Sequence, residues 1–121
     1  MESAKLSQQE DDKLYGLVSY LRYLMKTEKE CCVAMDKLKA LLEFTSQNSE
    51  PVKSQCEEQG NAVWRGLVDA FYVVQQEINR CEEEIASLLP KTNVWYKSSD
   101  GAGFSVRKSK SGKISVVWHK N

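Results

Sequence analysis

The chain has 121 residues, 41% of them hydrophobic and 28% charged, with a formal net charge of zero. This length suits one small domain, and the composition is too apolar for a disordered chain. Residues 1–90 hold 16 acidic and 10 basic residues, a net charge of −6, whereas residues 91–121 hold 1 acidic and 7 basic residues, a net charge of +6. The basic end therefore either docks on the acidic body or contacts an anionic partner, such as nucleic acid, a lipid surface or an acidic protein.

The N-terminal segment and the cysteines predict a cytoplasmic or nuclear protein. The segment MESAKLSQQEDD is polar and acidic, unlike a secretory signal or a transit peptide. No apolar run approaches the roughly 20 residues that span a bilayer. The sequence contains no C-x-x-C pair and no cysteine framework of the secreted type. We therefore expect the four cysteines to be small apolar core residues; they are Cys31, Cys32, Cys56 and Cys81.

Residues 7–44 are predicted to form a first long helix. Ser7 and Glu10 fit the S-x-x-E capping box, in which each side chain accepts a backbone N–H of the other residue. Apolar residues then recur at alternating steps of four and three, the rhythm that lines one side of a helix. A second, adjacent row widens this face and predicts more than one neighbour. The first row comprises Leu17, Leu21, Leu24, Cys31, Met35, Leu38 and Leu42, with Glu28 between them.

A second long helix is predicted from Val52 to Leu89, after the polar break TSQNSEP. Pro51 suits a first helical turn, and Pro90 disfavours helical dihedrals in the residue before it. Two helices of similar length with a short joint favour an antiparallel hairpin, although one continuous rod is the alternative. The heptad row of this helix comprises Gly60, Trp64, Leu67, Phe71, Val74, Ile78, Cys81, Ile85 and Leu88.

After Pro90 the apolar period changes to two, which predicts strands at 93–97, 104–108 and 114–118. A three-residue loop ending at Gly112 would place Phe104 opposite Trp118, and residue 106 opposite 116. A sheet this small needs support from the helix ends or from a partner. The predicted fold is therefore mostly α with a small β appendage: a disordered N-terminus at 1–6, a helical hairpin or coiled coil at 7–90 and a basic β-meander at 91–121.

The inventory of reactive residues does not favour an enzyme. The only histidine is His119, near the C-terminus, and no nucleophile motif is present. The carboxylate runs lie on predicted helix exteriors, and the cysteines lack the spacing of a tetrahedral metal site. The turn DGAGFS lacks the lysine of a phosphate-binding loop. We therefore expect no catalytic residues, no metal and no cofactor.

The apolar rows predict a non-enzymatic structural or adaptor subunit that associates with partner helices, in a homo- or hetero-oligomer. The alternative is a small nucleic-acid-binding protein that dimerises through its helices and uses the basic meander. The predicted partner-binding residues are Leu17, Leu21, Leu24, Met35, Leu38, Leu67, Phe71, Val74, Ile78 and Ile85. The candidate anion-binding residues are Arg107, Lys108, Lys110, Lys113 and Lys120.

Overall fold

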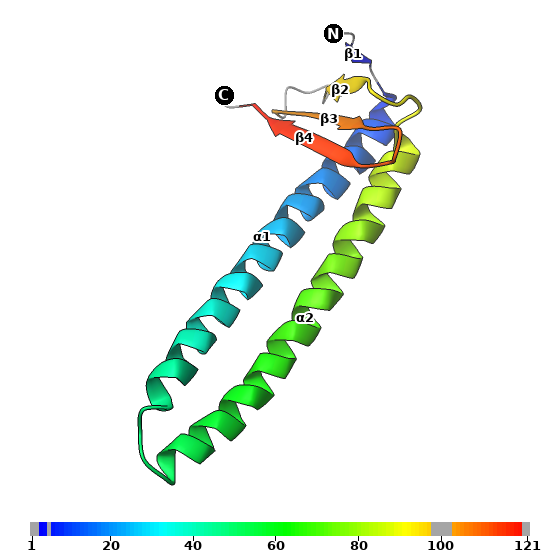
Figure 1. Ribbon diagram of the computed structural model, residues 1–121. Helices are drawn as coiled ribbons and strands as arrows, with labels where there is room; N and C mark the ends of the chain where they lie inside the picture. Colours follow the sequence, from blue (N-terminus) through cyan, green and yellow to red (C-terminus); the bar gives the residue numbers. More distant parts are fainter. Residues whose placement is uncertain (1–2, 5, 98–102, 120–121) are drawn as a thin grey trace. The chain divides into compact units, whose positions relative to one another are not determined.

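A computed structural model of the chain describes residues 3–4, 6–97 and 103–119. Two long helices, α1 (Gln8–Thr45) and α2 (Val52–Leu88), pack as a hairpin and are followed by an antiparallel sheet, which confirms the predicted fold class (Figure 1). The chain divides into two compact units. We call residues 1–23 and 78–121 the sheet unit, and residues 24–77 the hairpin unit.

The two helices begin and end close to their predicted boundaries. Ser7 caps α1, since its Oγ accepts the N–H of Glu10 at 3.3 Å and its own N–H donates to Glu10 Oε1 at 3.2 Å. This reciprocal pair is the predicted capping box, and it satisfies N–H groups that have no partner within a helix. Helix α2 begins directly after Pro51 and ends two residues before Pro90. Local sequence chemistry therefore sets the helix boundaries.

The sheet comprises β1 (Ser3–Ala4), β2 (Trp95–Lys97), β3 (Phe104–Lys108) and β4 (Ile114–Trp118), in that spatial order. The antiparallel pairing of β3 and β4 places Phe104 opposite Trp118, which confirms the predicted register. Gly112 closes their connection with φ 87°. A residue with a side chain is strained at this dihedral, so the glycine fixes the loop and hence the register.

The N-terminus differs from the prediction of disorder over residues 1–6. Ser3 and Ala4 form the short strand β1, which pairs in parallel with Trp95 and Tyr96 of β2. The pairing was not predictable from the pattern, because a two-residue strand shows no alternation of apolar and polar residues. Residues 1, 2 and 5 lie outside the described part of the chain.

In the sheet unit, the helix ends support the meander. The rings of Tyr15 on α1 and Phe104 on β3 lie with their centroids 6.0 Å apart. Lys108 donates a hydrogen bond of 2.8 Å from Nζ to the backbone carbonyl of Ala86, one of the last carbonyls of α2. The side chains that meet between the helices and the sheet are almost fully buried; they include Leu14, Val18, Cys81, Ile85, Tyr96, Phe104 and Val106. This layer is the core of the protein.

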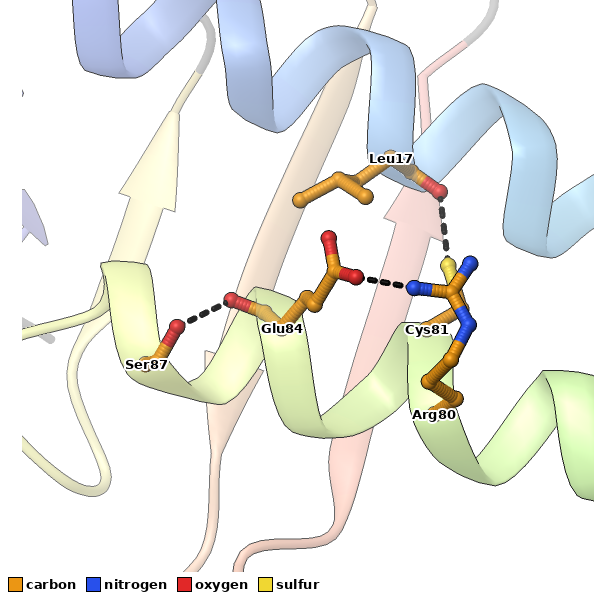
Figure 2. Close-up of polar contacts among 5 residues, drawn as sticks. All are labelled: Leu17, Arg80, Cys81, Glu84 and Ser87. Atoms are coloured by element: carbon orange, nitrogen blue, oxygen red, sulfur yellow. Dashed lines mark hydrogen bonds and ion pairs between the residues drawn. The ribbon is translucent and has the colours of Figure 1, made fainter.

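A thiol also joins the two helices within the sheet unit. Cys81 of α2 is fully buried, and its Sγ donates to the backbone carbonyl of Leu17 on α1 at 3.3 Å (Figure 2). On the exposed side of α2, Arg80 pairs with Glu84 one turn along (Figure 2). The cysteine thus acts as a small core residue with a weak donor.

The hairpin unit has only the two helices, which are antiparallel neighbours (Figure 1). Among residues 24–77, all of which the structure describes, only Leu24 and Gly60 are buried. An ideal Cβ built on Gly60 would overlap the side chain of Leu42. This glycine therefore permits a close approach of the two helices. An ideal Cβ built on Gly66, in contrast, has no neighbouring atom within 4 Å.

Candidate protein-interaction surface

The predicted partner-binding residues take two kinds of position. Leu21, Leu24, Ile78 and Ile85 are buried in the fold of the chain itself, with at most 7% of their surface exposed. The others are half-buried; they are Leu17, Met35, Leu38, Leu67, Phe71 and Val74. The heptad rows therefore serve the packing of this chain first. The apolar surface left for another molecule lies beside the rows.

Exposed apolar side chains lie on both sides of the heptad rows of the hairpin unit, and Met25, Trp64 and Tyr72 are among them. Phe44 is 69% exposed, Val73 is 65% exposed and Leu41 is 56% exposed. Together with Val52 and Val63 we call these residues the apolar flank. They occupy helix positions one step outside the two heptad rows, which is the only sequence signal that distinguishes them from the packed rows. The list of predicted partner-binding residues omits them because it followed the rows.

A groove of about 230 Å³ runs between α1 and α2 on the side of the apolar flank. Leu42 and Gly60 both line it, and the Leu42 side chain occupies the space in which a Cβ of Gly60 would lie. None of the lining side chains carries a formal charge. The groove is lined by Leu38, Leu41, Leu42, Thr45, Cys56, Gln59, Gly60 and Val63.

A second groove, of about 530 Å³, has a different chemistry. Leu42 lines both grooves, so they lie on either side of the Leu42–Gly60 contact. This one is bordered by the charged side chains of Lys39, Glu43 and Glu57. Charged residues are depleted at the centres of protein interfaces. The apolar side of the hairpin unit is therefore the better candidate for a buried contact.

The four candidate anion-binding residues that the structure describes are not gathered on one surface. The Arg107 guanidinium lies 4.9 Å from the centre of the Trp95 ring, and Lys108 is bonded to Ala86. Lys110 and Lys113 are exposed at the loop between β3 and β4, and Lys120 lies outside the described residues. Adjacent strand residues point to opposite faces, so residues 107 and 108 do not share a surface.

A serine–histidine pair is present in the sheet unit. The Ser105 hydroxyl lies 2.8 Å from Nε2 of His119. Such a pair can activate a nucleophile when a substrate can reach the hydroxyl. Ser105 is only 5% exposed, so the hydrogen bond satisfies a buried hydroxyl and fastens the end of β4.

Among the described residues, neither the remaining structural features nor the comparisons point to another site. No described group of three or more His, Cys, Asp or Glu residues could hold a metal ion. In the part of the chain that the structure describes, no helix has the length and apolar character needed to cross a membrane. Comparisons with protein-family models, with curated proteins and with solved structures find no match for this chain.

Proposed function

We propose that this chain is a non-enzymatic structural or adaptor subunit of a multiprotein assembly, and that partner helices bind its apolar flank. One observation carries the proposal: the hairpin unit leaves large apolar side chains in water beside an uncharged groove. Contiguous exposed apolar surface is uncommon on soluble proteins that act alone, and it commonly marks a binding site.

The geometry favours a helix as the bound element. Two antiparallel helices with a groove between them accept the apolar face of a third helix, whose side chains enter at spacings of three and four residues. The partner helices come from a different protein or from a second copy of the chain, and the stoichiometry of the complex distinguishes the two.

The alternative of nucleic-acid binding has less support. Lys108 is bonded to Ala86, so it cannot follow a phosphate backbone without breaking an internal contact, and Arg107 points to the opposite face of β3. The exposed Lys110 and Lys113 form too small a cluster to hold a strand by charge alone.

The proposal is tested by a pull-down of the tagged full chain, with the mass of the intact complex measured afterwards. The double variant Phe44→Ser, Val63→Ser should lose the partner while its unfolding midpoint stays unchanged, because both side chains are exposed. Aspartate at Leu67 or Val74 is a poorer choice, since these half-buried residues also hold the hairpin together.

The matched control is the double variant Glu43→Gln, Asn61→Ser, which alters the charged groove on the other side of the Leu42–Gly60 contact. This control should retain the partner. If the variant of the apolar flank retains the partner as fully as the control does, the proposed surface is wrong.

A further inference from the structure

The open edge of β4 forms a second candidate contact surface, which involves no residue of the apolar flank. β4 is the last strand of the sheet, with only β3 beside it in the described part of the chain (Figure 1). The N–H of Ser109 donates to the carbonyl of Lys113, and the N–H of His119 donates to the carbonyl of Gly103. The odd-numbered residues of β4 therefore face β3.

The even-numbered residues of β4 direct their backbone groups away from the sheet. By the alternation of a β-ladder, the N–H and C=O groups of Ile114, Val116 and Trp118 lie on the outer edge. A row of unpaired backbone groups is a template for another strand. Soluble proteins usually protect such an edge with proline or an inserted charge, and the β4 sequence ISVVW contains neither.

Positive charge stands at both ends of this edge. The exposed Lys113 precedes Ile114, and the Arg22 guanidinium of α1 lies 4.5 Å from the centre of the Trp118 ring. None of the four strands contains an acidic residue. An acidic segment would therefore be attracted to the edge, whereas a second copy of β4 would bring lysine and arginine toward the same charges.

We infer that the β4 edge binds an extended acidic segment of another protein by strand addition. Backbone groups of Ile114, Val116 and Trp118 bond the added strand, and Lys113 and Arg22 select acidic side chains. Lys113 then serves protein recognition rather than nucleic-acid binding.

The probe is an acetylated peptide of alternating valine and glutamate, about eight residues long, the length of an ordinary strand. Two control peptides separate the contributions: one has lysine in place of glutamate, and the other keeps the acidic sequence but has N-methylated backbone amides. Only the unmodified acidic peptide should bind the full chain, with the other two at least ~10-fold weaker.

Amide exchange followed by NMR locates the contact. Binding should slow exchange at Val116 and Trp118 by at least ~10-fold, because their N–H groups gain partners. Ser115 and Val117 already face β3, so their exchange should not change. Equal binding of the N-methylated peptide, or protection of other residues in place of Val116 and Trp118, would overturn the inference.

Two variants complete the test. Val116→Pro removes an outward N–H and leaves the bonds to β3, and it should weaken the peptide at least ~10-fold relative to the control Val117→Thr. If Val116→Pro does not fold, Lys113→Glu with Arg22→Glu should reverse the preference toward the lysine peptide. No acidic binding at about 1 mM would refute the site. If the chain self-associates in the absence of peptide and amide exchange at Val116 is then slowed, the edge instead binds a second copy of the chain.

Discussion

The sheet unit and the hairpin unit are built from the same two helices, yet they bury their apolar rows to different degrees. In the sheet unit, Leu14, Cys81 and Ile85 are fully buried, because the strands form a third layer over the helices. In the hairpin unit, Leu38, Leu67 and Phe71 remain half-buried. When two helices pack without a third layer, each covers only one narrow strip of the other's surface. A heptad row therefore indicates where two helices touch, but not how completely the side chains of the row are buried.

The largest expected effect on stability comes from replacing a leucine by alanine, once in the sheet unit and once in the hairpin unit. Leu14→Ala should lower the free energy of unfolding by about 3 kcal/mol, since Leu14 is fully buried and leaves a cavity. Leu38→Ala should cost about 1 kcal/mol, because water already reaches the half-buried side chain. Urea unfolding followed by circular dichroism measures both. Equal losses would show that the hairpin unit is covered as fully as the sheet unit.

A smaller effect is expected at the glycines of α2. Gly66→Ala should stabilise the helix by up to about 1 kcal/mol, because alanine favours helix and nothing lies near its methyl group. Gly60→Ala brings the same gain in helix propensity but forces Leu42 to move, so it should be less stable than Gly66→Ala by about 1–3 kcal/mol. Thermal unfolding of the two variants gives the difference. A Gly60→Ala variant as stable as Gly66→Ala would show that the helices do not meet there.

The smallest effect concerns the polar ends of α1. Ser7→Ala should cost about 1 kcal/mol, because the capping box of the sheet unit loses its hydroxyl acceptor. At the other end, in the hairpin unit, the Ser46 hydroxyl only donates to the exposed carbonyl of Glu43, and Ser46→Ala should change stability by less than about 0.5 kcal/mol. Amide exchange in the first turn of α1 should rise for Ser7→Ala alone. Fraying at both ends would argue against the cap.

Local chemistry made much of the fold predictable. Ser7 with Glu10, and the prolines at 51 and 90, marked the helix boundaries, and Gly112 fixed the register of β3 and β4. Each of these features depends on a few neighbouring residues. The sequence pattern shows such features directly, because the turn or cap needs a particular residue type at a particular position.

Features that depend on packing between distant parts of the chain were harder to predict from the sequence. The pairing of β1 with β2 joins residues more than ninety positions apart and rests on two residues. The predicted apolar face of β3 and β4 is buried at Phe104 and Val106 but only half-buried at Val116 and Trp118, because β4 lies at the edge. The exposure of the apolar flank was likewise hidden, since spacing alone does not show which side of a helix remains uncovered.

Chemical labelling of the Cys81 thiol can report how often α1 and α2 separate. A reagent reaches this sulfur only when α1 and α2 separate beside Leu17, because the side chain is fully shielded there. Cys32, exposed on the same chain, supplies the reference rate of an unprotected thiol. The ratio of the two labelling rates therefore measures how often the helices part, without any change to the sequence.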